Sequence, residues 1–166
     1  MPKLTLWLKN LLFTIFVPGT VAVLVPILLR LSSLPQFPFE LGAARWIGLL
    51  IMIAGILIYS WCLWDFMRAR GTPAPIDAPK ELVVRGLYRY VRNPMYIGVL
   101  LIILGKAVIF ETGLLLIYAA VVWLAVHTFV IIYEEPTLAR LFGESYEHYR
   151  REVGRWIPRG SKPSIN

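Results

Sequence analysis

Four long runs of apolar residues, separated by short polar segments, dominate the chain. They cover residues 11–29, 46–66, 94–110 and 114–133. A helix that crosses a bilayer needs about 20 mostly apolar residues, with a usual range of roughly 17–25. Each run reaches that range, the third only just. The pattern therefore predicts an all-α polytopic membrane protein with four transmembrane helices, built as a single domain over 1–166.

The prolines predict where these helices are irregular. Pro18 and Pro26 lie inside the first run and predict a kinked helix. Pro136 follows the fourth run and predicts a break or kink, after which apolar residues at helical spacing predict an amphipathic helix over 137–153. Three prolines within 71–79 predict a stiff, extended path through the loop before the third run.

Glycines on two of the runs predict how the helices pack. Gly48 and Gly55 are seven residues apart in the second run, and Gly98 and Gly105 repeat this spacing in the third. Residues seven apart share one helix face, and small residues on such a face let two transmembrane backbones approach closely. We therefore expect the second and third helices to be in close contact.

Composition narrows the class of protein. Hydrophobic residues make up 58% of the 166 residues, and the mean hydropathy is +0.66. These values exclude an ordinary water-soluble domain. The single Cys62 lies inside the second run, so no disulfide framework is possible. The sequence has no Cys-x-x-Cys motif and no His-rich cluster, so a metal site is not expected.

The distribution of positive charge predicts the orientation. With a cytoplasmic N-terminus, 14 of the 17 basic residues fall on the inside, which leaves Arg30, Arg45 and Lys106 at the outer side. Both termini and the loop 67–93 are then cytoplasmic. Lys106, near the outer end of its run, is expected to extend its amine towards the headgroups. The net charge of +7 reflects topology and attraction to anionic lipids, and nucleic acid is not an expected partner.

Polar residues converge at one end of the predicted hairpin. Residues 92–98 (RNPMYIG) open the third run, and Glu134 and Glu135 close the fourth. Only the segment 111–113 joins these two runs, so they form an antiparallel hairpin whose polar edges share one membrane face. Ionisable groups at a membrane are costly unless they are solvated or paired. Their convergence predicts a functional site on the cytoplasmic side.

Asn93 and Pro94 have a structural reading beside the functional one. Asn is a favourable residue before the first turn of a helix, and Pro is favourable within that turn. The same helix N-terminus also offers free N–H groups to an anion. A cofactor carboxylate could bind there, assisted by Arg92 or Tyr96.

The two glutamates and a nearby histidine also leave alternatives open. Glu134 and Glu135 could simply lie in the first turn of the next helix, where its dipole favours acidic side chains. Adjacent residues point about 100° apart on a helix, so one could cap the helix while the other faces inward. His127 lies seven residues before Glu134, so their faces nearly coincide. It is either a functional histidine or a hydrogen-bonded packing residue.

Several short motifs together resemble one family of integral membrane enzymes. The pattern is Leu82-Val83, Gly86-Leu87-Tyr88, Arg92-x-Pro94-x-Tyr96-x-Gly98, Glu134-Glu135 and Phe142-Gly143-x-x-Tyr146-x-x-Tyr149. In this order across a hairpin it resembles the isoprenylcysteine carboxyl methyltransferase and phospholipid methyltransferase superfamily. The resemblance covers the C-terminal half, whereas the N-terminal half offers hydropathy but no motif.

This resemblance implies a function and a set of site residues. It implies an S-adenosylmethionine-dependent methyltransferase that acts on a lipophilic or membrane-partitioned acceptor through a carboxylate, thiol or amine. The cofactor would be bound on the cytoplasmic side by Leu82, Val83, Tyr88, Arg92, Asn93, Pro94, Tyr96, Glu134 and Glu135. A cationic amine must lose a proton before it attacks, and Glu134 or His127 are the candidate catalytic bases.

Two positions depart from the family pattern. Asn93 stands where the family often has His, and an amide cannot titrate, so no proton transfer is expected there. Val130 stands where the prenylcysteine enzymes share an Arg that would bind the substrate carboxylate. The departure at Val130 argues against a prenylcysteine substrate.

Two other functions are compatible with the sequence. The chain could be a small membrane scaffold or transporter component, in which the glutamates only cap a helix and the basic loop binds lipid headgroups. It could also be an inert homologue that keeps the fold. The first predicts that S-adenosylmethionine has no effect on thermal stability.

Overall fold

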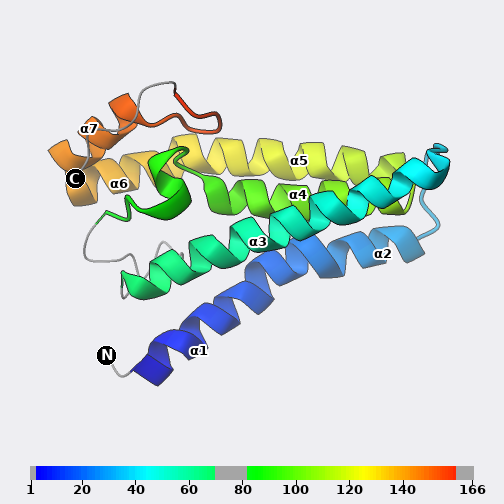
Figure 1. The fold of residues 1–166 in the computed structure, drawn as a ribbon, viewed down its shortest axis with the longest axis horizontal. Coiled ribbons are helices and arrows are strands. Elements are labelled where there is room, and N and C mark those ends of the chain that lie inside the picture. Colours follow the sequence, from blue (N-terminus) through cyan, green and yellow to red (C-terminus); the bar gives the residue numbers. More distant parts are fainter. Residues whose placement is uncertain (1–2, 70–81, 160–166) are drawn as a thin grey trace.

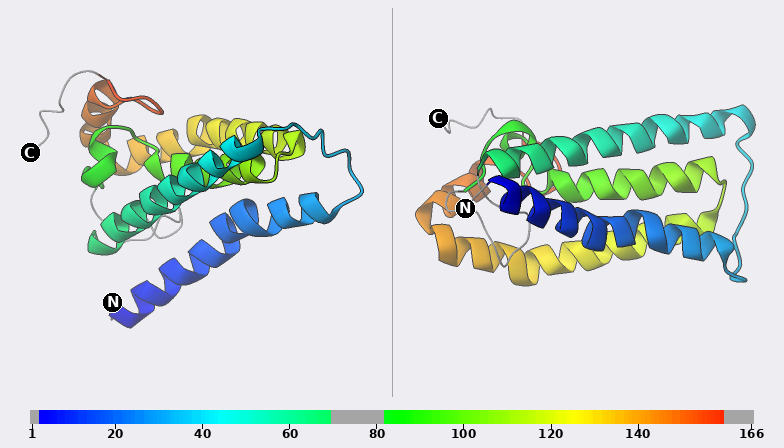
Figure 2. Two further views of the ribbon diagram at one scale, coloured as in Figure 1. Left: turned by 45° about the vertical axis from the view of Figure 1, so that its right-hand side comes forward. Right: turned by 90° about the horizontal axis from the view of Figure 1, so that it is seen from below.

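Long helices lie side by side in an elongated bundle (Figures 1 and 2). The computed structural model describes residues 3–69 and 82–159, so the proline-rich stretch 71–79 lies outside the described residues. The elements are α1 (Lys3–Thr14), η1 (Ile15–Leu24), α2 (Val25–Leu31), η2 (Gly42–Trp46), α3 (Ile47–Arg68), η4 (Gly86–Arg89), α4 (Pro94–Ile109), α5 (Gly113–Phe129), η5 (Val130–Glu134), α6 (Glu135–Phe142) and α7 (Glu144–Glu152). No β-strand occurs in these two stretches, which confirms the all-α prediction.

The apolar helices have the dimensions of an integral membrane protein. Trp7–Leu31, Gly42–Arg68 and Gly113–Phe142 are long and apolar enough to cross a bilayer. α4 has 16 residues, which corresponds to about 24 Å, somewhat less than the roughly 30 Å hydrocarbon core. Large apolar side chains point outward along the bundle, including Leu50 (67% exposed) and Ile132 (71% exposed). Such a surface suits lipid rather than water.

α3 and α4 touch through their glycines, as the sequence predicts. A Cβ atom added to Gly55 would lie 2.6 Å from the carbonyl oxygen of Gly98, and one added to Gly48 would lie 2.6 Å from that of Gly105. No real Cβ fits at such distances. The expected small-residue contact is therefore confirmed, and it brings the loop end of α3 against the start of α4.

The first long helix is irregular, and side chains from other helices satisfy its carbonyl groups. η1 is a π-helix that contains Pro18, and Pro26 follows in α2. Because Pro26 has no N–H, the carbonyl oxygen of Ala22 has no α-helical partner. The Nζ of Lys106 donates to that oxygen at 2.7 Å, and the Tyr118 hydroxyl donates to the carbonyl of Val21 at 2.8 Å. The expectation that Lys106 reaches out to the headgroups was therefore wrong.

Lys106→Met should destabilise the protein by about 1–2 kcal/mol, because the carbonyl of Ala22 loses its donor inside the bundle. Thermal unfolding in detergent measures this loss. Arg45→Met is the matched control, since Arg45 is an exposed basic residue whose ion pair with Glu111 is long, at 3.8 Å. Equal melting temperatures for Lys106→Met and the wild type would contradict the assigned role.

The fourth long helix runs through Pro136 rather than ending there. Its turns α5, η5 and α6 are continuous, and Pro136 lies in the first turn of α6. The π-helical turn η5 shifts the hydrogen-bond register just before the proline, so the chain continues as a helix. Of the predicted break or kink at Pro136, the break does not occur, and the helix is irregular directly before the proline. The chain turns at Gly143 instead (φ 53°), which divides the single helix predicted over 137–153 into α6 and α7.

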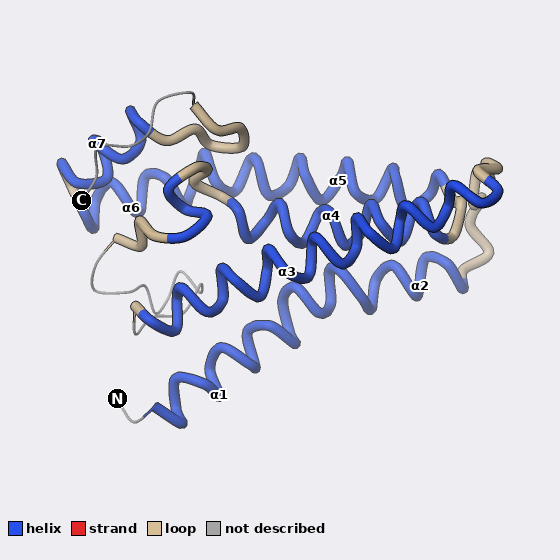
Figure 3. Tube along the Cα trace, in the orientation of Figure 1, coloured by secondary structure: helices blue, strands red, loops and turns tan. Residues whose placement is uncertain are grey.

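The loops gather at the two ends of the bundle (Figure 3). At one end, the turn between α4 and α5 holds the loop that follows α2: the Thr112 hydroxyl donates to the carbonyl of Gln36 at 2.6 Å. At the other end lie the start of α1, η4, α6 and α7 (Figure 1). We call this second end the η4 end, and it carries the residues that the motifs singled out.

Candidate active site

An extended segment and a short 3-10 turn lead into α4 and form one wall of the site. Val83 and Tyr88 are buried in a cluster with Tyr59 and Cys62 of α3 and with Met95 of α4. Neighbouring side chains of an extended chain point to opposite sides. Leu82 accordingly packs in a different cluster, with Tyr146, Tyr149 and Val153. The structure thus gathers Val83 and Tyr88 and places Leu82 behind them, against α7.

The backbone of Tyr88 is bound by a side chain of α7. Its backbone carbonyl accepts a buried hydrogen bond from the Tyr149 hydroxyl of α7 at 2.7 Å. Burial raises the pKa of the Tyr88 phenol well above its usual value, with smaller contributions from Cys62, Tyr149 and Glu134. The contribution from Glu134 shows that this carboxyl lies within electrostatic range of the ring. Tyr88 is thus a neutral group in the same neighbourhood as Glu134.

Glu134 pairs with the tyrosine that opens α4. The Tyr96 hydroxyl donates to Oε2 of Glu134 at 2.9 Å. This contact joins the start of α4 to the end of η5, which are 38 residues apart. The two polar edges of the hairpin therefore meet at the η4 end, as the sequence predicts.

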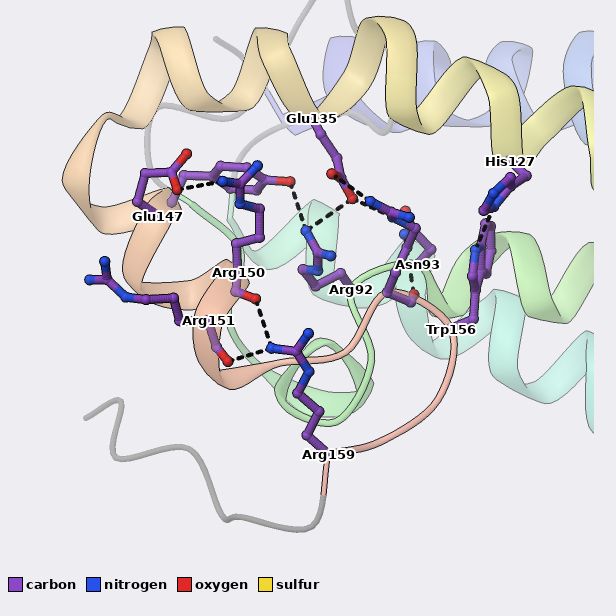
Figure 4. Close-up of polar contacts among 11 residues, drawn as sticks. Arg92, Asn93, His127, Glu135, Glu147, Arg150, Arg151, Trp156 and Arg159 are labelled. Carbon is purple, nitrogen blue, oxygen red and sulfur yellow. Dashed lines mark hydrogen bonds and ion pairs between the residues drawn. The ribbon is translucent and has the colours of Figure 1, made fainter.

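Glu135 is bound by two arginines from separate segments (Figure 4). Arg92 approaches its Oε1 at 3.0 Å, and Arg155 donates to both oxygens, at 2.6 and 3.0 Å. The side chains of Arg92 and Glu135 are 7% and 9% exposed. The hydrogen bond to Glu135 raises the pKa of Arg155, which burial opposes only in part. Arg92 also donates to the Tyr146 hydroxyl at 3.2 Å.

Asn93 fastens the tail rather than capping the helix. It occupies the position before α4, with Pro94 in the first turn, but its side chain makes no capping bond. Its Nδ2 donates to the carbonyl of Arg155 at 3.2 Å (Figure 4). The backbone of Arg92 adds a second link, since its N–H donates to the carbonyl of Gly154 at 2.9 Å. The tail segment 153–159 is thereby folded back over the start of α4.

His127 makes its contacts with two tryptophans. Its Nδ1 accepts a hydrogen bond from the Trp156 indole at 2.9 Å (Figure 4). Its ring stacks on that of Trp123, with centroids 5.0 Å apart. The π-helical turn η5, which ends at Glu134, changes the angle between His127 and Glu134 from that of a regular α-helix. A neutral imidazole that accepts at Nδ1 carries its proton on Nε2, so it has no free lone pair to act as a base.

The structure separates the roles of the two glutamates. Glu134 contacts a neutral hydroxyl, whereas Glu135 is neutralised by two cations, in line with the expected divergence of adjacent helical residues. The motifs did not single out Arg155 or the pairing of Trp156 with His127, because both belong to the tail beyond the last motif. Within residues 3–69 and 82–159, no group of three or more His, Cys, Asp or Glu side chains could hold a metal ion.

Comparison with known proteins identifies the family. The sequence profile described as phospholipid methyltransferase matches residues 43–145, which is more than half of the chain. The chain belongs to the phospholipid methyltransferase family. The match covers α3, α4, α5 and α6, and it excludes the first long helix.

The chain is similar to curated proteins of two kinds, an isoprenylcysteine O-methyltransferase and methanethiol S-methyltransferases. The protein-S-isoprenylcysteine O-methyltransferase of Schizosaccharomyces pombe is 37% identical over 78 residues, 46% of this chain and 33% of the relative. The methanethiol S-methyltransferase of Pseudomonas deceptionensis is 30% identical over 68% of this chain and 43% of the relative. That of Crocosphaera subtropica is 27% identical over 72% of this chain and 46% of the relative. The chain thus spans less than half the length of these curated relatives.

Proposed function

We propose that this protein is a membrane methyltransferase that uses S-adenosylmethionine and acts on a lipophilic or membrane-partitioned acceptor. The observation that carries the proposal is the pairing of Glu134 with Tyr96 at the η4 end, beside the buried Tyr88. Family membership supports methyl transfer as the reaction. The pairing offers a shielded carboxylate at the place where an acceptor and a methyl donor would have to meet.

The residues present fit the proposed cofactor. The Nε of Arg92 is buried and has no hydrogen-bond partner among the described residues, although another nitrogen of the same guanidinium binds Glu135. A buried donor without a partner is costly, and a carboxylate such as that of S-adenosylmethionine would satisfy it. Val83 and Tyr88 would supply an apolar wall for the rest of the molecule. When bound, the cofactor supplies an electrophilic methyl group on a sulfonium.

The side chains of the site would contribute mainly orientation and exclusion of water. Methyl transfer is an in-line displacement, so a fixed geometry supplies much of the rate. Tyr96 orients Glu134 through its hydrogen bond. For an acceptor that must lose a proton, Oε1 or Oε2 of Glu134 would accept it. We propose Glu134 rather than His127 as this base, because Nδ1 of His127 is already bonded to Trp156.

The acceptor is proposed to lack a carboxylate, because position 130 holds a valine rather than an arginine that could bind one. Val130 is 1% exposed and lies one turn before Glu134, where a prenylcysteine carboxylate would need a cation. The methanethiol S-methyltransferases align over a larger share of this chain than the isoprenylcysteine enzyme does. These two observations favour a thiol or another acceptor without a carboxylate.

We further propose that the η4 end faces the cytoplasm. The start of α1, η4, α6 and α7 share this end (Figure 1), and most of the basic residues belong to these segments or to the loop beside them. The positive-inside rule then orients the whole bundle. The site would open on the inner leaflet, where S-adenosylmethionine is available.

Binding of S-adenosylhomocysteine tests the proposal directly. A ligand at 100 times its dissociation constant should stabilise the purified protein by about 2.7 kcal/mol, which a thermal melt in detergent detects. Adenosine triphosphate at the same concentration is the control, since it shares the nucleoside but lacks the amino-acid moiety. If S-adenosylhomocysteine causes no shift and calorimetry shows no saturable heat, the protein is not this enzyme, and the scaffold reading takes its place.

A further inference from the structure

α3 ends with a buried acidic side chain that the proposed mechanism does not use. Asp65 lies one turn before the end of the helix and is 5% exposed. Its Oδ2 is buried and has no hydrogen-bond partner among the described residues. Buried carboxylate oxygens are nearly always paired, because burial without a donor costs free energy. This oxygen therefore calls for a partner.

The charged neighbours of Asp65 do not supply that partner. Arg68 and Arg85 lie within electrostatic range of the carboxylate, and the Trp61 side chain acts on it as a hydrogen-bond donor, although no hydrogen bond reaches Oδ2. In the described stretches neither arginine forms an ion pair with Asp65 within 4.0 Å. The two arginines lower the cost of a negative charge at this place. They leave Oδ2 free to accept a hydrogen bond from something else.

Oδ2 of Asp65 lies against η4, the turn that carries Tyr88 of the proposed cofactor site. A Cβ atom on Gly86 would collide with Oδ2 of Asp65, and Gly86 has a positive φ of 55°. A glycine is therefore needed there both for the backbone conformation and for the approach of the carboxylate. Gly86 lies between Val83 and Tyr88, the two residues of η4 and its approach that line the site.

Asp65 also shares a helix face with the other wall residues of α3. Tyr59, Cys62 and Asp65 are spaced by three residues and are all buried, and the first two pack against Val83 and Tyr88. The carboxylate thus continues the same wall towards the η4 end. Its oxygen belongs to the neighbourhood where S-adenosylmethionine is proposed to bind.

We propose that Asp65 binds the methyl donor, with Oδ2 accepting a hydrogen bond from one of its hydroxyl or amino groups. This inference rests on the proposed function. S-Adenosylmethionine carries ribose hydroxyls, an adenine amine and an α-ammonium group, each of which is a suitable donor. Asp65 would complement Arg92, which offers a buried donor to the carboxylate of the same molecule.

Affinity for S-adenosylhomocysteine, measured by calorimetry on the full chain in detergent, tests the inference. Hydrogen bonds to a charged group are among the stronger ones, so Asp65→Asn and Asp65→Ala should each weaken binding by about 10- to 100-fold. Glu147→Gln is the matched control, since Glu147 is a half-exposed acid on α7 that forms an exposed ion pair with Arg150. It should bind like the wild type.

The melting temperature without ligand separates a binding role from a structural one. Removal of an unpaired buried charge should leave it unchanged or raise it. Unchanged affinity in both variants overturns the inference, and so does an affinity loss that comes with a lower melting temperature in both. If the wild type itself does not bind S-adenosylhomocysteine, the proposed function fails first.

Analogues then identify the group that Asp65 binds. S-Inosylhomocysteine lacks the adenine amine, S-adenosyl-4-thiobutyrate lacks the α-amino group, and the 2′-deoxy and 3′-deoxy analogues each lack one ribose hydroxyl. The analogue that lacks the partner of Asp65 should bind about equally to the wild type and Asp65→Ala. If all four lose the same factor on mutation as S-adenosylhomocysteine does, the proposed direct hydrogen bond is excluded.

Discussion

Glu134→Gln is expected to lower the rate of methyl transfer by about 10²- to 10⁴-fold for an acceptor that must lose a proton, which is the usual contribution of a positioned base. The amide keeps the shape of the side chain and can still accept the hydrogen bond that Tyr96 donates at 2.9 Å. The fold should therefore survive, while the capacity to take a proton is lost. Cofactor affinity should change little.

The measurement is transfer of a labelled methyl group to candidate acceptors, with a thiol and an amine as separate arms. Tyr96→Phe should reduce the rate less, by about 10-fold, because it removes only the orienting hydrogen bond. Glu144→Gln is the control on the neighbouring helix, where the side chain is exposed. Wild-type rates for Glu134→Gln with every acceptor would remove Glu134 from the site and leave the family assignment intact.

Glu135→Gln is expected to lower the stability of the protein by about 3 kcal/mol, because it leaves two arginines without their anion. Arg92 and Arg155 both bind Glu135 within 3.0 Å, and the Arg92 side chain is 7% exposed. Water can solvate Arg155, which is 30% exposed, but it reaches Arg92 poorly. The melting temperature should fall by about 6–12 °C.

The comparison that makes this result specific is Glu147→Gln. Glu147 forms an ion pair of similar length, 2.9 Å to Arg150, but its side chain is 39% exposed and that of Arg150 is 47% exposed. Exposed pairs contribute about 0–1 kcal/mol, so the control should melt close to the wild type. Equal melting temperatures for the two variants would contradict the buried network described for Glu135.

The sequence predicts the helices and their closest contact because both depend on residue type alone. Hydropathy locates α3, α4 and α5 to within a few residues. The glycines at 48, 55, 98 and 105 identify the faces in contact, since no other residue lets two backbones come so near. These features follow from the bilayer and from van der Waals contact, and they need no knowledge of the tertiary structure.

Helix phase is harder to predict than helix position. The spacing of His127 and Glu134 predicts a shared face only if the helix is regular throughout. The π-helical turn η5 makes the helix irregular just before Pro136, because a π-turn holds about one residue more than an α-turn and so alters the register. Apolar residues such as Val130 and Ile131 suit an α- and a π-turn equally, so the sequence carries no local signal for the difference.

The sequence also does not predict which residues from distant segments bind the side chains of the site. Arg155 reads as one more basic residue that sets topology, yet it donates two hydrogen bonds to Glu135. Trp156 reads as an interfacial anchor, yet its indole bonds to His127. Asp65 lies inside an apolar run and carries no motif. Each of these roles depends on the folding back of the tail or on the close approach of η4 to α3.

The π-helical turn η5 makes the contact between Tyr96 and Glu134 sensitive to the number of residues in the fourth long helix. An α-helix rotates by about 100° per residue, so loss of one residue between α5 and α6 would swing Glu134 away from Tyr96 even though every side chain remained. Point substitutions there leave the direction of the Glu134 side chain around the helix axis unchanged, whereas insertions and deletions rotate it. A gap in this stretch between related chains therefore signals a rebuilt candidate site rather than harmless variation in length.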